Sequence, residues 1–213
     1  MRNLFAFLVV AFFTTTIQAQ DTQAALAYME DINNAVDDTQ GETWRYLKAA
    51  TKGRSARTME RKREALVDEI GDVIGKVRKI GGFKGDRAYQ TEVLNYLKLT
   101  HIVIREDYSQ IMDMEDIAER SYDDMEAYLL AKEIASEKMD SALTIYQNAQ
   151  EEFAAKHNIE LVEGEKSRRQ EKIAKASKAL GYYNNIFLIF FRANVQESYV
   201  IDAMNRNDLV SLE

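Results

Sequence analysis

The sequence predicts an all-α protein, an up-and-down bundle of about five long helices around a single core. The chain has 213 residues and no proline, so no residue removes a helical hydrogen bond or forces a bend. Apolar residues recur three and four positions apart through almost every segment after residue 22, a spacing that places them on one face of a helix. The connections between these stripes are short, which makes neighbouring helices antiparallel.

The first nineteen residues have the layout of a secretory signal peptide. Met1–Asn3 carries one positive charge, Leu4–Phe13 is an apolar run too short to span a bilayer, and Ala19 supplies a small residue for cleavage. We therefore expect residues 1–19 to be removed and residues 20–213 to form a single helical-bundle domain. No later apolar stretch approaches 18 residues, so we expect no membrane span in the mature chain. The expected location is the periplasm or the cell surface and extracellular space.

Two helices are expected in the first part of the mature chain. The first covers residues 22–51 and is the least regular. The second carries an apolar stripe in which Arg63 is the one interruption. Ser55 can cap its start, and Gly81 and Gly82 can end it in a left-handed turn. The stripe consists of Met59, Leu66, Ile70, Val73, Val77 and Ile80. Gly71 and Gly75 lie four apart, which would let another backbone approach closely.

The middle of the chain should hold two more helices. One begins after Asp86, and the other begins near Tyr122 and ends at a cap formed by Asn158. A single helix from residue 87 to residue 157 would be extreme for a domain of this size. We therefore expect a break between Ser109 and Ser121.

A capping box at Ser167–Gln170 should open the last long helix. Within it, Ile186–Phe191 (IFLIFF) is apolar on all sides. Six residues cannot cross a membrane, so this segment is expected in the middle of the bundle, covered from every direction.

Composition excludes several classes of protein. The chain contains no cysteine, which excludes disulfides, thiolate zinc sites, iron–sulfur clusters and cysteine nucleophiles. The formal net charge of −7 is wrong for a general nucleic-acid binder. The charge is uneven, because residues 44–87 are basic and residues 106–140 are acidic. These segments either face each other and partly cancel, or form a dipolar surface that orients a partner.

Catalytic constellations are not evident in the sequence. A di-metal carboxylate bundle would need two Glu-x-x-His pairs, but neither His101 nor His157 follows a glutamate three positions earlier. His101 is expected in the core, and His157 in the last turn of a helix, where it complements the dipole. We expect no enzymatic activity and no cofactor.

The sequence contains two candidate binding sites. Asp116, Glu119 and Asp123 would share one face if their segment were helical, and carboxylate oxygens suit hard cations; a solvated helix face is the preferred interpretation. Aromatic side chains could line a pocket for a small apolar ligand between helices, or simply fill the core. They are Trp44, Tyr183, Phe187, Phe190 and Phe191.

Several stretches together resemble an uncharacterised family of exported, helical bacterial surface proteins. They are Gly53–Arg57, Phe83–Asp86, Asp113–Ala131 and the IFLIFF segment. The resemblance implies an exported helical protein and no known activity, cofactor or catalytic residue.

The expected function is therefore that of an exported, non-enzymatic helical bundle acting through contacts with an unidentified envelope or extracellular protein. A carrier of a small apolar ligand is the first alternative, and weak binding of a divalent cation is the second.

Overall fold

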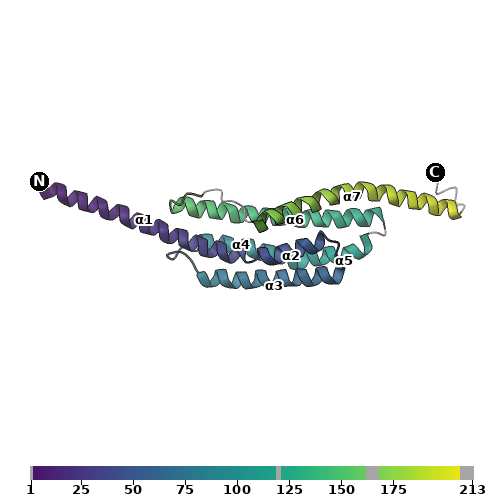
Figure 1. The fold of residues 1–213 in the computed structure, drawn as a ribbon, viewed down its shortest axis with the longest axis horizontal. Coiled ribbons are helices and arrows are strands. Elements are labelled where there is room, and N and C mark those ends of the chain that lie inside the picture. The colour runs from purple at the N-terminus through teal and green to yellow at the C-terminus, as the bar shows by residue number, and fades with distance from the viewer. Residues whose placement is uncertain (1, 119–120, 162–167, 207–213) are drawn as a thin grey trace. The chain divides into compact units, whose positions relative to one another are not determined.

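The protein is an all-α bundle, as the sequence predicts (Figure 1). The computed structural model describes residues 2–118, 121–161 and 168–206, with side chains from Gln20 onward except those of Asp116, Asn185 and Leu188. Its elements are α1 (Arg2–Asp37), α2 (Gln40–Ala50), α3 (Ala56–Ile80), α4 (Ala88–Ile102), the π-helical turn η1 (Val103–Asp107), α5 (Tyr108–Ala118), α6 (Tyr122–Lys156) and α7 (Arg168–Arg206). Because α4, η1 and α5 are continuous and α2 follows α1 almost directly, these elements correspond to the five expected helical segments.

The chain divides into two compact units. Unit 1 contains Met1–Gln40, Asp68–His101 and Asp140–Glu165; unit 2 contains Gly41–Val67, Ile102–Met139 and Lys166–Glu213. The helices α3 and α6 each supply one part to each unit, so the single domain expected for residues 20–213 contains two groups of packed segments.

Aliphatic side chains from three helices form the core of unit 1. The α3 stripe is confirmed here, since its second half lies in this core. The largest side chains with less than 2% exposure in this unit are Ile32, Ile70, Val73, Val77, Val93 and Leu97. Burial of each contributes about 1.5–3 kcal/mol to folding, so this core is a principal source of the stability of unit 1.

The turn between α3 and α4 confirms the expected glycine stop. Gly81 adopts a left-handed φ of 78°, which glycine accepts without steric cost, and its carbonyl accepts a hydrogen bond from the Tyr28 hydroxyl at 2.9 Å. A Cβ on Gly82 would lie 2.5 Å from the carbonyl oxygen of Asp86. The backbone therefore approaches closely at Gly82 and leaves no room for a side chain.

The packing role expected for the two glycines inside α3 is wrong. A Cβ on Gly71 would meet only the Nε2 atom of His101, at 4.0 Å, and a Cβ on Gly75 would have nothing within 4 Å. Both positions have room for a side chain, because no neighbouring backbone packs against them.

A partly buried hydrogen-bond network crosses unit 1 at Asn33. This residue does not interrupt α1, which continues to Asp37. Its Oδ1 atom accepts hydrogen bonds from the Tyr89 hydroxyl at 3.0 Å, the Tyr146 hydroxyl at 2.8 Å and Nε2 of Gln150 at 2.9 Å. Burial raises the pKa of both tyrosines well above the usual value. The two hydroxyls therefore stay protonated and link α1 to α4 and α6.

Arg63, which interrupts the apolar stripe of α3, is explained by the π-helical turn in unit 2. Its guanidinium is buried, with the residue 7% exposed, and its Nη1 donates to the carbonyls of Ile104 and Arg105 at 3.2 and 3.0 Å. Glu60 accepts from Nε and Nη2 at 2.9 and 2.5 Å, and this hydrogen bonding lowers the pKa of the Glu60 carboxyl. A π-helical turn has one extra residue and i+5 hydrogen bonds. Arg63 thus joins α3 to the irregular turn.

The break between α5 and α6 falls inside the expected interval. α5 ends at Ala118 and α6 begins at Tyr122. The Ser121 hydroxyl accepts a hydrogen bond from the Asp124 backbone N–H at 3.1 Å and donates to the Asp124 carboxylate at 2.8 Å, which caps α6. After α6, Asn158 adopts a left-handed φ of 53°, as expected for its C-cap. The predicted cap of α7 at Ser167 lies outside the described residues.

Candidate interaction surface

The inner side of α7 packs against α6 within unit 2. Lys132 Nζ on α6 donates to Asn184 Oδ1 on α7 at 3.3 Å. The guanidinium of Arg192 lies 5.4 Å from the ring centroid of Tyr122. Residue numbers rise along α6 as they fall along α7, so the two helices are antiparallel. Burial lowers the pKa of Lys132, as expected for an amine held between two helices.

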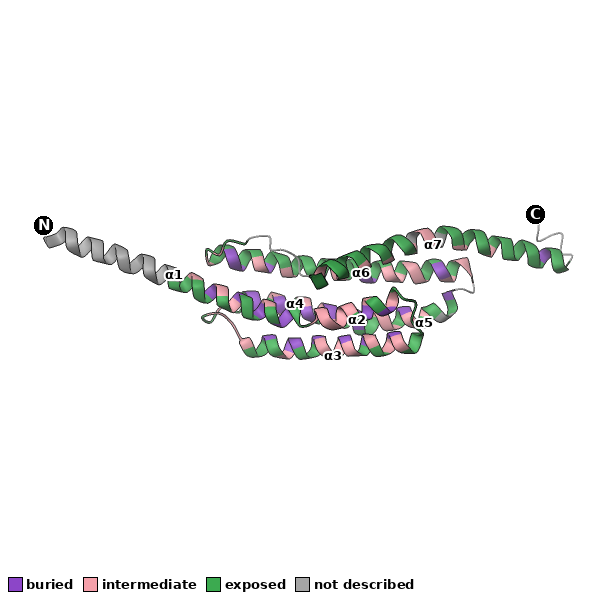
Figure 2. Cartoon of the chain, in the orientation of Figure 1, coloured by how far each residue is buried: buried purple, intermediate pink, exposed green. Residues whose placement is uncertain are grey.

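The opposite side of α7 is apolar and exposed. Figure 2 shows α7 coloured as exposed along most of its length. The expectation that IFLIFF is covered from every direction is therefore wrong: Ile189 is 71% exposed and Phe190 66%. The other large apolar side chains exposed on α7 are Tyr182, Tyr183, Tyr199, Val200, Ile201 and Met204. The physical reason is that α6 covers only one side of α7, while the apolar residues of α7 lie on two.

The five aromatic residues considered as a ligand pocket are only partly brought together. Tyr183, Phe187 and Phe191 form a ladder along α7, with successive ring centroids 5.5 and 5.7 Å apart. Phe190 lies outside this ladder and is exposed. Trp44 on α2 contacts Lys172, whose amine is 6.0 Å from its ring. Lys172 is about 22 Å along α7 from Phe187, given a rise of 1.5 Å per residue.

The three acidic residues considered as a cation site do not lie on one helix. Asp116 belongs to α5, with its side chain outside the description; Glu119 is outside the described residues; Asp123 is in the first turn of α6. Among the described residues, no group of three or more His, Cys, Asp or Glu side chains could hold a metal ion.

An aromatic cluster in unit 1 surrounds one of the two histidines. The His157 ring lies 5.0 Å from Phe83 and 4.5 Å from Phe153, and its backbone carbonyl accepts a hydrogen bond from Thr22 at 3.1 Å. Tyr28 packs on both phenylalanines. Burial, with a contribution from the Asp86 carboxylate, raises the pKa of Tyr28 to about 12. The Tyr28 phenol and the His157 imidazole are thus both held by packing contacts within this cluster.

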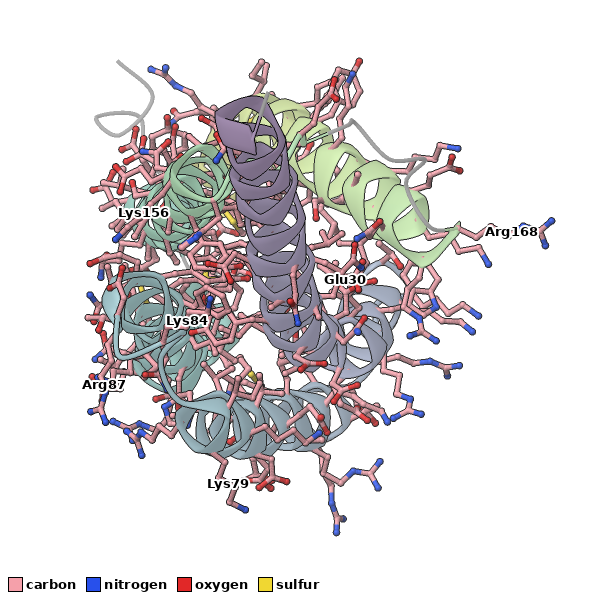
Figure 3. The ribbon with its side chains drawn as sticks, turned by 90° about the vertical axis from the view of Figure 1, so that its left-hand side faces the viewer. Glu30, Lys79, Lys84, Arg87, Lys156 and Arg168 are labelled. Atoms are coloured by element: carbon pink, nitrogen blue, oxygen red, sulfur yellow. The ribbon has the colours of Figure 1, made fainter. Side chains whose placement is uncertain are left out.

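Charged side chains line the outside of unit 1. Figure 3 shows Lys79 and Arg87 pointing outward, while Lys84 and Lys156 pair with Asp21 and Asp86 at 2.6 and 2.5 Å. In unit 2, within the part of the chain that is described, no ion pair joins basic residues 44–67 to acidic residues 106–139. The opposite charges of these two segments are therefore not neutralised by ion pairs between them.

The apolar outer side of α7 is thus the most unusual surface feature of the described chain. None of the described helices is both long and apolar enough to cross a membrane. Comparison of the chain with protein-family models, with characterised proteins and with solved structures finds no match in any of the three.

Proposed function

We propose that this is an exported, non-enzymatic helical-bundle protein that acts by binding another protein chain in the cell envelope. The observation that carries the proposal is the outer side of α7, where Tyr182, Ile189, Phe190, Val200 and Met204 are each between 47% and 71% exposed. With usual side-chain sizes, these five residues together expose about 600 Å² to solvent. This area is at the upper end of the largest apolar patch that a monomeric protein normally exposes. A surface of this kind is typical of protein–protein contacts.

The N-terminal pattern supports the location of this contact. Residues 1–19 have the layout of an export signal, and the absence of cysteine and proline excludes lipid attachment through a lipobox and sortase-type anchoring. Retention at the envelope would then depend on contacts with other proteins, which the outer side of α7 can supply.

Site-specific photocrosslinking in the producing cells tests the proposal. A photoreactive residue replaces Phe190, and a control variant carries it at Ser198, which is exposed and points about 80° away from Phe190 and about 180° away from Ile189 around α7. We expect a specific adduct from position 190 and none from position 198. The captured chain, identified by mass spectrometry and purified, should bind the native protein and not the Ile189→Asp variant. Equal labelling from both positions, or binding unaffected by Ile189→Asp, would contradict the proposal.

A further inference from the structure

We propose that the outer side of α7 binds a second copy of this chain, in a parallel and in-register two-helix coiled coil. This inference rests on the proposed function, because it names the partner of the same surface. It follows from three features of the outer side of α7: the spacing of its apolar residues, the residues on either edge of them, and the area that this side exposes.

The stripe has a heptad spacing. Its members follow one another in steps of four, three, four, three and four, the pattern of alternating core positions in a coiled coil. They are Tyr182, Ile186, Ile189, Ala193, Gln196 and Val200. At 3.6 residues per turn this stripe points about 180° away from Phe187 and Phe191. The covering of α7 by α6 therefore leaves the stripe open to another helix.

The edges of the stripe select a parallel orientation. Ile186, Ala193 and Val200 are equivalent core positions of the heptad. In a parallel pair, the residue just before each of them lies opposite the partner residue that is five positions later in the sequence. This rule places Arg192 opposite Glu197, and Tyr199 opposite Met204. All four are exposed, and two-fold symmetry makes each contact twice. In an antiparallel pair, each edge of the stripe lies opposite the same edge of the partner helix. Arg192 and Glu197 are on different edges, so an antiparallel pair cannot bring them together.

The central residues of the stripe support the same register. Gln196 occupies a core position, where a polar side chain fixes register when it meets its own copy. The Arg192 guanidinium, although 5.4 Å from the Tyr122 ring, remains at the exposed edge, within reach of a partner's carboxylate. A lipid surface fits less well, because Gln196 and Glu197 lie within or beside the apolar stripe.

The exposed area is sufficient for a dimer. The roughly 600 Å² described above belongs to three residues of the stripe and to Phe190 and Met204 at its edge. Two copies that bury these residues would together bury about 1,200 Å², which is at the lower end of the range for specific interfaces. The dimer should therefore be reversible, with its affinity sensitive to single changes along the stripe.

Disulfide trapping tests both association and orientation, since the natural chain contains no cysteine. Three single variants of the purified protein are compared: Ile186→Cys, Val200→Cys, and Ser198→Cys as the control on the other side of α7. We expect the first two each to form a disulfide-linked homodimer, and the control to remain monomeric. A disulfide from only one of Ile186→Cys and Val200→Cys, or from neither, would contradict the parallel register and overturn the proposal. So would equally rapid crosslinking of Ser198→Cys.

A charge reversal provides the second measurement. Arg192→Glu replaces two attractive contacts by two repulsive ones and should raise the dimer dissociation constant about tenfold in sedimentation equilibrium. Adding Glu197→Arg to the same chain should restore the original dissociation constant.

A natural protein that is monomeric at 100 times its cellular concentration would overturn the inference. If a different protein is still captured from position 190 and binds as described, the proposed function stands; if no partner is captured, both fail.

Discussion

Replacement of Arg63 by methionine tests whether this side chain holds α3 to the π-helical turn. Methionine keeps an unbranched apolar stem and removes every hydrogen-bond donor. The buried carbonyl of Ile104 and the partly buried carbonyl of Arg105 would lose a charged donor at 3.2 and 3.0 Å, and hydrogen bonds to charged groups contribute about 1.5–3 kcal/mol each. Part of this loss is offset, because the variant no longer has to bury a charged guanidinium. We expect the free energy of unfolding to fall by about 2–3 kcal/mol.

Urea unfolding followed by circular dichroism measures this change as a lower midpoint at unchanged slope. Two variants separate the carbonyl contacts from the ion pair. Glu60→Gln keeps both contacts of Arg63 with the carbonyls and alters only its partly exposed ion pair with residue 60. This change should lower the free energy of unfolding by less than about 1 kcal/mol. Arg63→Lys keeps the charge but not the planar fork, and should fall between the other two. Unchanged or increased stability of Arg63→Met would refute the reasoning, since it would mean that desolvation of the guanidinium outweighs its hydrogen bonds.

Three other predictions follow from positions already described. Phe190→Ala should change the free energy of unfolding by less than about 0.5 kcal/mol, because the ring is 66% exposed; a loss of 3 kcal/mol in a urea titration would mean that the ring is buried. Gly75→Ala should stabilise α3 by roughly 0.5–1 kcal/mol, whereas Gly82→Ala should destabilise the turn, because its Cβ would meet the Asp86 carbonyl at 2.5 Å; similar melting temperatures for the two would contradict this. The pKa of Tyr28, raised to about 12, gives a stabilising contribution that is complete below the unfolded value near pH 10 and is lost between pH 10 and about pH 12; the urea midpoint should therefore fall over this range, and less steeply in Tyr28→Phe.

The sequence predicted most accurately those features that depend on neighbouring residues. The apolar stripe of α3 and the stop at Gly81 are set by helical periodicity and by the left-handed preference of glycine. The cap at Asn158 is likewise a local feature, because asparagine accepts a left-handed backbone. The break before Tyr122 is predicted on a different ground, since one helix over residues 87–157 would be too long for a domain of this size.

Features that depend on distant contacts were missed or misread. Arg63 was visible as an interruption of a stripe, but its hydrogen-bond acceptors lie some forty residues away in a π-helical turn that has no sequence signature. Asn33 lies in the segment that the sequence marks as the least regular, whereas its partners are three side chains on other helices. The apolar run at Ile186–Phe191 says that a helix has apolar residues on all sides, and not which of those sides the chain itself covers. Only the arrangement of α6 beside α7 shows which side remains exposed.

The placement of Trp44 makes the two units optically distinguishable. It is the only tryptophan in the chain and lies in unit 2, on α2 beside Lys172, so emission excited at 295 nm reports on that unit alone. Unit 1 carries its own signal in the stacked rings of Tyr89 with Phe153 and Tyr96 with Tyr146, which contribute to near-ultraviolet circular dichroism. Because α3 and α6 run through both units, the two signals should change together in a denaturant titration. Separate midpoints would instead reveal a half-folded species in which these long helices are ordered at one end only.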